Sequence, residues 1–342
     1  MTRSSKGNNG CLWLFVLSLL SIFSFVIIKV LFPFSSALSA IIAVFISLVF
    51  LKLVLGNKSF KSLIRSGIFV FIILFAVQFG FRFLLNILVG EQEKASFTKE
   101  EKISKTIKIE DHDTIVLFTS SRNWKDNYGN DFKGDLSVRE SDYLRLKNHI
   151  KNFKAPANGY FWGSLYDYID RTDIPSLDLV IEAFKEIHQE NNLNQMEFAE
   201  MVVSCIHDIP YSFVFQNDCP TEDFDETTKS ILENCSECCI GNVKYGIQNP
   251  VSFLKNLKGD CDTRTVLIYS ILKYFNYDVA IANSEFYRHS IIGINLPASG
   301  YHKVHNGKKY FLWETTAKYF ELGNLSPSFN DVTHWNIILT SK

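Results

Sequence analysis

The chain has 342 residues and a formal net charge of −1, so it gives no bulk electrostatic reason to expect a nucleic acid as its partner. Hydrophobic residues make up 47% of it and are spread unevenly. Nearly every residue from Leu12 to Val89 is apolar, whereas the rest reads as an ordinary soluble domain. The composition therefore divides the chain near residue 90 into an apolar part and one domain of usual size.

Three apolar runs fill the first part, at residues 11–31, 37–55 and 68–89. Each reaches the roughly 20 residues that span about 30 Å of hydrocarbon as a helix. A signal peptide is the competing interpretation of the first run, but its apolar stretch is too long and no small-residue cleavage site follows. The sequence thus predicts three transmembrane helices within residues 1–90, and an integral, multi-pass membrane protein in contact with the lipid bilayer.

Basic residues predict the orientation, since cytoplasmic loops are enriched in lysine and arginine. Arg3 and Lys6 precede the first run, and the loop before the third run is basic as well, with Lys58, Lys61 and Arg65. With three spans, this pattern places the N-terminus in the cytoplasm and the domain on the periplasmic or extracellular side. Three lysines just after the third run argue mildly for the opposite orientation: Lys94, Lys99 and Lys102.

Residues 91–110 are rich in lysine and glutamate and predict a solvated stalk, followed by a domain over residues 111–342. Apolar periodicity predicts helices over residues 141–153, from 177 onward, over 195–206 and from Cys261, the last buried on all sides. Short β-rich runs predict strands at Ile115–Thr119, Val279–Ala282, His289–Ile294, Lys309–Glu314 and Trp335–Leu339. A buried helix followed by a run of antiparallel strands indicates an α+β domain.

Three residues of this domain have the chemistry of a thiol catalyst. Cys261 begins a predicted helix, where unpaired N–H groups and the helix dipole favour a thiolate. His289 opens one predicted strand and Glu314 closes the next, so adjacent strands would bring imidazole and carboxylate together. A nucleophile, a base and a group that orients the base are what nucleophilic catalysis requires. Taken alone, each of the three is more often structural.

The local sequence around these residues resembles the transglutaminase-like superfamily, and more narrowly its bacterial membrane-anchored members. The resemblance rests on GDCDTRT before an apolar helix, on a histidine opening a strand, and on an aromatic strand ending in Glu-Thr-Thr. It extends to Phe198–Tyr211 and Tyr245–Leu254 and covers roughly residues 175–325. It implies a papain-like core, in which a central helix with an N-terminal cysteine packs on an antiparallel sheet. Cys261 is then the nucleophile, His289 the base and Glu314 the orienting acid, although many relatives have aspartate in the third place.

The chemistry that the resemblance implies is acyl transfer without a cofactor, through a thioester on Cys261. Hydrolysis of a peptide or amide is the default, because water is always present and an amine acceptor needs a dedicated site. A protein cross-linking transglutaminase is one alternative. Another is a non-catalytic binding or assembly module that keeps only the fold, and a domain that regulates the spans is a third. A peptide or protein substrate is expected, and the sequence does not indicate an oligomeric state.

His207 is a candidate for the oxyanion site. Papain-like enzymes use a glutamine side chain on an upstream segment as one donor, and relatives of this chain often read Gln-x-Ile-Pro-Tyr there. This chain has His207-Asp208-Ile209-Pro210-Tyr211. A ring N–H of His207 would then replace the glutamine, while a histidine held at a helix end beside Asp208 is the competing structural interpretation.

Other residues near the predicted triad have supporting roles. Asp260 and Asp262 flank the cysteine, as helix N-terminal carboxylates or as part of substrate binding. Arg264 in the first turn can pair with either, and Trp313 is expected to pack against the triad. The aromatic cluster at residues 160–162 is expected in the core rather than around a ligand.

Four of the seven cysteines lie close together, at Cys219, Cys235, Cys238 and Cys239, in a segment with few large apolar residues. Disulfides are the favoured interpretation, most simply Cys219 with one of the later three. Unpaired thiols and a four-thiolate zinc site remain as alternatives, although the adjacent pair Cys238-Cys239 does not fit a regular zinc knuckle. We therefore expect no metal.

Overall fold

The computed structural model describes residues 9–31, 36–55, 68, 102–110, 113–157, 160–219 and 226–342. The chain divides into two compact units, Met1–Gly90 and Glu91–Lys342.

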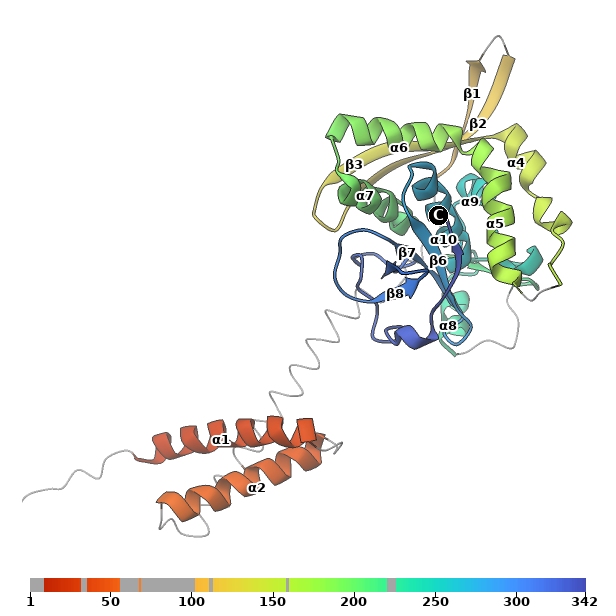
Figure 1. Ribbon diagram of the computed structural model, residues 1–342. Helices are drawn as coiled ribbons and strands as arrows, with labels where there is room; N and C mark the ends of the chain where they lie inside the picture. Colours follow the sequence, from red (N-terminus) through yellow and green to blue (C-terminus); the bar gives the residue numbers. More distant parts are fainter. Residues whose placement is uncertain are drawn as a thin grey trace, which may run out of the picture. The chain divides into compact units, whose positions relative to one another are not determined.

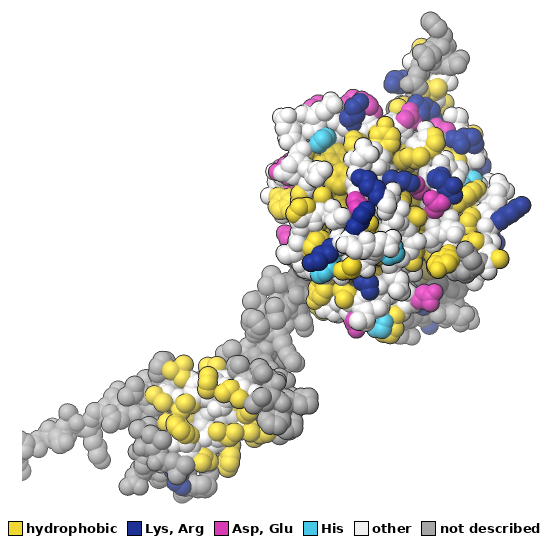
Figure 2. Space-filling model, in the orientation of Figure 1, with side chains coloured by type: hydrophobic (Ala, Val, Ile, Leu, Met, Phe, Trp, Pro, Cys, Tyr) yellow, Lys and Arg dark blue, Asp and Glu magenta, His cyan; other side chains and the backbone are white. Residues whose placement is uncertain are grey.

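The described residues of the first unit form helices α1 (Asn9–Leu31) and α2 (Ser36–Leu55), which pack against each other (Figure 1). Leu17, Val44 and Leu51 are buried between them. Other large apolar side chains of the pair are exposed: Leu19, Ile22, Phe23, Ile27, Ile41, Phe45, Ile46, Val49 and Phe50. The space-filling view shows hydrophobic side chains on the visible face of this unit (Figure 2).

The prediction of three transmembrane helices, and with it a multi-pass membrane protein with an outward-facing domain, is wrong for the part of the chain that the structure describes. No helix there is long and apolar enough to cross a membrane. An all-apolar helix is predicted to be buried, but its sequence does not say by what. Here α1 and α2 bury apolar side chains against each other. Of the third predicted span, residues 68–89, only Ile68 is among the described residues.

The second unit is α+β, as the sequence predicts, and begins with a three-stranded antiparallel sheet in the order β1-β2-β3. Its strands are β1 (Ser104–Glu110), β2 (Asp113–Lys125) and β3 (Asp131–Arg139). β1 lies within residues 91–110, so the predicted stalk is in part a strand; its residues 91–101 lie outside the described part.

Helices then surround the centre of this unit. They are α4 (Glu140–Leu146), α5 (Phe161–Asp173), α6 (Asp178–Asn191), α7 (Gln195–Asp208), α8 (Glu226–Asn234), α9 (Pro250–Asn256) and α10 (Cys261–Tyr274). Short 3-10 turns lie at His149–Asn152, Ile174–Ser176, Lys244–Gly246 and Val332–His334. A capping box starts α7: the side chain of Asn194 accepts from the backbone of Glu197, whose carboxylate accepts from the N–H of Asn194 at 2.8 Å. The 3-10 turn at His149–Asn152 replaces the end of the helix predicted over residues 141–153.

A five-stranded antiparallel sheet closes the unit, in the order β10-β6-β7-β9-β8. Its strands are β6 (Val279–Ser284), β7 (His289–Ile294), β8 (His302–His305), β9 (Lys308–Trp313) and β10 (Asn336–Thr340). A separate parallel pair joins β4 (Phe213–Val214) to β5 (Cys239–Ile240). Helix α10 packs on β6 and β7 and is flanked by α5, α7 and α9 (Figure 1). An apolar helix at the centre of a layered fold explains why its sequence shows no polar face.

Arg264 joins the elements around the start of α10 and is fully buried. Its guanidinium donates to the carbonyl of Gly259 at 3.1 Å, of Ile206 at 2.8 Å, and of Ile209 and Pro210 at 2.6 Å each. Burial lowers the pKa of this side chain to about 10, so it remains charged at neutral pH. The sequence suggested a carboxylate partner for Arg264, whereas the structure pairs it with four backbone carbonyls.

Replacing Arg264 with Met should lower the free energy of unfolding by about 3 kcal/mol or more, because buried carbonyls lose their donors. Urea unfolding of the full chain measures this. The matched control is Arg171→Met, whose guanidinium is exposed and pairs with Asp167 one turn away. The control should change stability by less than about 1 kcal/mol. Equal effects of the two substitutions would show that the hydrogen bonds of the buried Arg264 guanidinium do not stabilise the fold.

Candidate active site

Cys261 is the first residue of α10 and lines a cavity of about 700 Å³. Asp260 caps the helix by accepting the backbone N–H of Thr263 at 3.1 Å. The turn before it requires glycine, because a Cβ at Gly259 would lie 2.8 Å from both Phe253 and Thr263. The thiol thus sits at a fixed helix start, and only 8% of the residue is exposed.

His289 and Glu314 form a buried pair beside this cavity. β7 and β9 are antiparallel neighbours with Ile292 opposite Trp313, which brings the start of β7 and the end of β9 to the same edge. His289 Nε2 lies 2.9 Å and 3.0 Å from the two carboxylate oxygens of Glu314. One of these oxygens, Oε1, also accepts the backbone N–H groups of Thr315 and Thr316 at 2.9 Å each and the Thr316 hydroxyl at 2.7 Å. The carboxylate is therefore fixed in position, and it fixes the imidazole.

The charges in this pair support each other. Burial opposes ionisation of Glu314, but the interaction with His289 and the hydrogen bonds from Thr316 outweigh it and hold the pKa of Glu314 at about 2. Burial likewise opposes protonation of His289, yet the Glu314 carboxylate raises the pKa of His289 above its usual 6.5. The pair therefore favours an imidazolium next to a carboxylate.

The thiol does not have the low pKa that its helix position predicts. Burial, followed by the carboxylates of Asp262 and Asp260, raises the pKa of Cys261 well above 9.0. A hydrogen bond with the backbone of Ser290, the residue after His289, acts in the opposite direction. A helix N-terminus supplies only about half a positive charge, which burial and two nearby acids outweigh. At rest the thiol therefore keeps its proton.

Asp262 is held beside the sulfur by residues that sequence reasoning missed. Its Oδ1 lies 3.9 Å from Cys261 Sγ and accepts the hydroxyl of buried Tyr166 at 2.8 Å. Tyr166 also lies 3.0 Å from the hydroxyl of Ser290, which accepts the side-chain amide of Asn283 at 2.8 Å. Tyr166 is on α5, outside the range of the family resemblance. One sequence signal could have indicated its position. Tyr166 follows Trp162 by four residues, which places both on one face of α5, and Trp162 lines the cavity.

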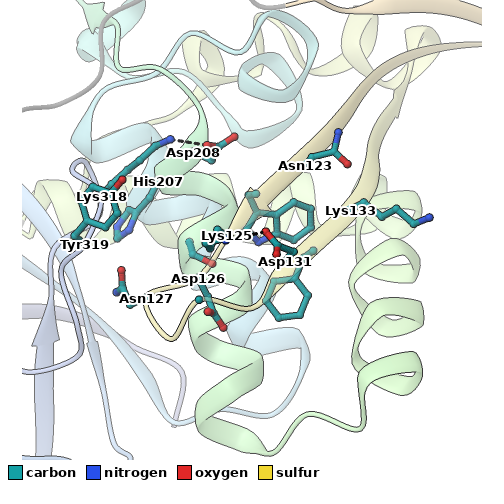
Figure 3. Close-up of a pocket in the computed structure, with 14 residues that line it drawn as sticks. Asn123, Lys125, Asp126, Asn127, Asp131, Lys133, His207, Asp208, Lys318 and Tyr319 are labelled. Carbon is teal, nitrogen blue, oxygen red and sulfur yellow. Dashed lines mark hydrogen bonds and ion pairs between the residues drawn. The ribbon is translucent and has the colours of Figure 1, made fainter.

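His207 lines a different cavity, of about 850 Å³, bounded by the β2–β3 hairpin, the end of α7 and the segment after Glu314 (Figure 3). Its Nε2 donates to the backbone carbonyl of Glu314 at 2.7 Å. Burial lowers the pKa of His207 to about 4, so its ring is neutral. Beside it, Asp208 pairs with Lys318 at 2.5 Å and with Arg122 at 2.7 Å. The sequence predicted that a ring N–H of His207 binds an oxyanion. In the structure this N–H donates to the backbone carbonyl of Glu314.

Trp313 is fully buried, and its Nε1 donates to the carbonyl of Phe320 at 2.8 Å. It therefore belongs to the core below the sheet strands β7 and β9, directly before Glu314 in the chain. Of the aromatic cluster at residues 160–162, Trp162 lines the Cys261 cavity and Tyr160 is 73% exposed, so the cluster is not simply core.

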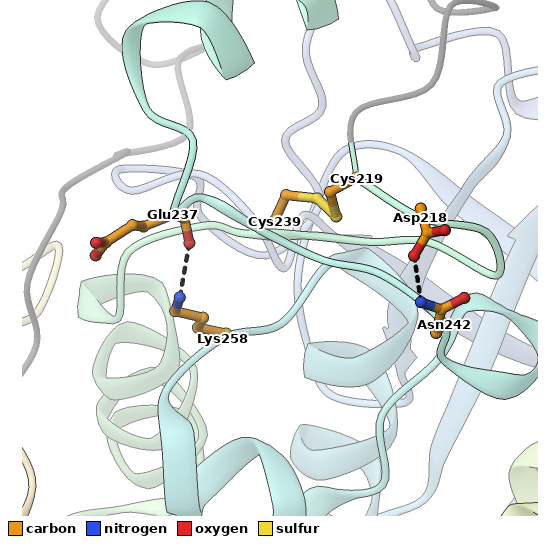
Figure 4. Close-up of a disulfide and its surroundings, with 6 residues drawn as sticks. All are labelled: Asp218, Cys219, Glu237, Cys239, Asn242 and Lys258. Atoms are coloured by element: carbon orange, nitrogen blue, oxygen red, sulfur yellow. Dashed lines mark hydrogen bonds between the residues drawn. A yellow bond between two sulfur atoms is a disulfide. The ribbon is translucent and has the colours of Figure 1, made fainter.

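The clustered cysteines form two disulfides, Cys219–Cys239 and Cys235–Cys238. The first lies between an Asp218–Asn242 hydrogen bond and a bond of 2.7 Å from Lys258 to the carbonyl of Glu237 (Figure 4). No group of three or more metal-ligating side chains occurs in the part of the chain that the structure describes. The disulfides hold the segment that carries β5 beside β4, where the Phe213 N–H donates to the backbone carbonyl of Cys238 at 2.9 Å. β4 in turn forms one wall of the Cys261 cavity.

Comparison of the chain with protein families, with curated proteins and with solved structures gave no match. The resemblance to the transglutaminase-like superfamily stays a prediction from the local sequence.

The pKa values of the buried pair predict how stability depends on pH. The depressed pKa of Glu314 contributes stability above pH 4.5 that is lost as the pH falls toward about 2. The raised pKa of His289 contributes stability below pH 6.5 that is lost as the pH rises through its higher folded value. Glu314→Gln should therefore destabilise the protein most between about pH 4.5 and 6.5, and less on either side.

Urea midpoints from pH 3 to 9 (roughly the range in which both groups titrate) measure this difference. Glu182→Gln is the control, because Glu182 is exposed and pairs with Lys185 on the same helix. A difference between Glu314→Gln and the unsubstituted chain that does not vary with pH would refute the ion pair.

Proposed function

We propose that the second unit is a thiol-dependent acyl-transfer enzyme, with Cys261 as nucleophile, His289 as base and Glu314 as the acid that orients the base. The observation that carries the proposal is the buried His289–Glu314 pair at 2.9 Å, whose histidine lines the same cavity as Cys261 at the start of a buried helix. Four donor groups contact the carboxylate, namely His289 Nε2, the backbone N–H groups of Thr315 and Thr316, and the Thr316 hydroxyl, so its position relative to the imidazole is fixed. The local resemblance to transglutaminase-like proteins supports the same assignment.

The reaction begins with proton transfer from the Cys261 thiol to His289. Glu314 engages Nε2, which leaves Nδ1 to take this proton. The sulfur attacks the carbonyl carbon of a peptide or amide, and the backbone N–H of Cys261 at the start of α10 is the candidate donor to the developing oxyanion. The C–N bond then breaks, and the imidazolium gives its proton to the departing amine. Water attacks the thioester with His289 again as base, which releases a carboxylic acid and restores the thiol.

The raised pKa values of Cys261 and His289 favour a particular order of events. A thiol that keeps its proton cannot attack until the base removes it, so proton transfer to His289 precedes the attack on the carbonyl or accompanies it. Because His289 must be neutral to act, the reactive form becomes more abundant as the pH rises through the pKa of His289, above 6.5.

A non-catalytic binding module is the second candidate. The same buried, protonated thiol beside two acids favours it, since an unreactive cysteine needs no activation. A cross-linking enzyme would use the first half of the same reaction, with an amine in place of water.

A panel of amides, peptides and activated esters, offered to the full-length chain, separates these candidates. Samples quenched in acid at early times are digested and examined by mass spectrometry for a thioester on Cys261, which neutral hydroxylamine should remove. Product containing ¹⁸O from labelled water indicates hydrolysis, and product joined to an added amine indicates transamidation. Failure of every donor, including activated esters, to acylate Cys261 would favour the binding module.

With any donor that turns over, Cys261→Ala and His289→Ala should reduce kcat/KM to background, a loss of roughly 10⁵-fold or more. Glu314→Gln keeps the shape and part of the hydrogen bonding but loses the charge. It should retain a rate roughly ten to a hundred times above that background. Cys205→Ala is the matched control, because Cys205 is also a free, buried thiol, and burial raises its pKa to about 12. Full activity of Glu314→Gln would remove Glu314 from the mechanism.

A further inference from the structure

Aromatic side chains line much of the cavity that contains Cys261. Six of them are half-buried, so their rings are partly open to a ligand: Trp162, Tyr211, Phe213, Phe215, Tyr245 and Tyr287. Phe213 stacks on Phe215 with ring centres 5.6 Å apart, and Tyr211 meets Phe213 edge to face at 5.4 Å. These three alternate along β4 and its flanks, so one face of a strand presents a continuous aromatic wall.

Carboxylates occupy the same cavity. Asp262, half-buried, has its Oδ1 3.9 Å from the Cys261 sulfur, and the described residues give its Oδ2 no hydrogen bond. Glu285 also lines the cavity and is exposed, whereas buried Asp260 is engaged in capping α10. Two basic side chains line the same cavity: Arg288, exposed on the turn before β7, and His289, which is paired with Glu314. Two of the aromatic rings already attract a cation of the protein itself, since Arg264 lies 5.6 Å from the ring centre of Tyr211 and Lys244 lies 4.6 Å from that of Tyr245.

The aromatic rings and the carboxylates of the cavity both favour a cationic ligand. The faces of aromatic rings carry negative electrostatic potential and attract ammonium and guanidinium groups. A carboxylate that is partly withdrawn from water attracts the same groups more strongly than one in bulk solvent. An anionic ligand would meet unfavourable potential from the aromatic rings and from the carboxylates, whereas Arg288 is exposed to solvent, which weakens its attraction for an anion.

We infer that the cavity accepts acyl donors that carry a positively charged group, an ammonium or a guanidinium, close to the reacting carbonyl, and that Asp262 determines this specificity. The inference rests on the proposed function for the acyl donor, but the preference for a cation does not. Tyr166 makes Asp262 a preorganised partner, because its hydroxyl fixes Oδ1, while Oδ2 has no hydrogen bond from the described residues.

The cation would also act on the nucleophile. Asp262 is one of the groups that keep the proton on Cys261. A positive charge bound at Asp262 offsets that influence and favours the thiolate. The correct substrate would therefore activate the thiol that attacks it, and a neutral or anionic analogue would not.

Thiosulfonate reagents that differ only in charge test the preference without any substrate. The Cys261 thiolate attacks the sulfenyl sulfur of the reagent, a disulfide forms, and methanesulfinate leaves. The full-length chain is treated with 2-aminoethyl (cationic), 2-sulfonatoethyl (anionic) and methyl (neutral) methanethiosulfonate, and the adduct on the Cys261 peptide is followed by mass spectrometry. The thiolate fraction of the free protein cancels in the ratio of the cationic to the anionic rate, because both reagents start from the same protein. The ratio therefore measures what the charge of the reagent adds, by binding at Asp262 and by favouring the thiolate there.

The reference is the same ratio for Cys261 in the urea-unfolded chain. In the folded chain, the ratio of the cationic to the anionic rate should be larger than this reference by about tenfold or more. Asp262→Asn should remove most of that excess. Asparagine has the shape of aspartate and can still accept from Tyr166, so a folded protein is expected. Glu186→Gln removes the same charge from a different groove, beside α6, and should leave the ratio unchanged.

The inference would be overturned if the ratio of the cationic to the anionic rate were the same in the folded and in the unfolded chain. It would also be overturned if Asp262→Asn did not reduce the excess in the folded chain. If Asp262→Asn fails to fold, adding a high concentration of salt to the unsubstituted chain must reduce the excess, and an excess insensitive to salt overturns it. A chain that shows the cation preference but forms no thioester with any donor contradicts the proposed enzyme only. One that forms thioesters without the preference contradicts only the specificity.

Discussion

The guanidinium of Arg264 is the interaction on which the second unit depends. It lies one turn into α10 and binds carbonyls at the end of α7 and in the turn at Gly259, so two segments distant in sequence, residues 206–210 and 259–264, meet around one buried charge. A buried charge is tolerated only when its hydrogen bonds are satisfied, and five N–H donors in a rigid fork suit converging carbonyls. The position of Cys261 follows, because Gly259 and Arg264 fix the helix start from both sides.

Glu314 plays the corresponding role on the sheet side. Its carboxylate holds His289, while its carbonyl accepts the ring N–H of His207 from the neighbouring cavity. The short segment after β9 is thus fixed at both its side chain and its backbone. Lys318, four residues further on, anchors the same segment to Asp208 on α7. The candidate site combines a helix start and a strand end, each secured by buried polar contacts that leave little freedom to move.

Periodicity predicts the parts of the fold that are strongly patterned. The bounds predicted for β7 match the structure, as does the start of α10, since apolar alternation and the Gly259-Asp260 turn are local signals. β3 and β8 were not predicted, because their residues are largely polar and become strands only through pairing. Composition predicted apolar helices in the first unit but could not show what buries them. The raised pKa of Cys261 also escaped prediction, since it depends on burial and on Tyr166 holding Asp262 in place.

The central claim, that Cys261 and His289 act as one unit, is tested most directly by the rate at which neutral iodoacetamide alkylates Cys261. The rate is measured at pH 7.5 by peptide mass spectrometry in the full-length chain and in His289→Ala (a pH about one unit above the usual histidine pKa). The account predicts that loss of the imidazole slows alkylation of Cys261 by about tenfold or more, because the sulfur loses the base that accepts its proton. Alkylation of Cys261 at the same rate in both proteins, with both shown to be folded, would contradict it.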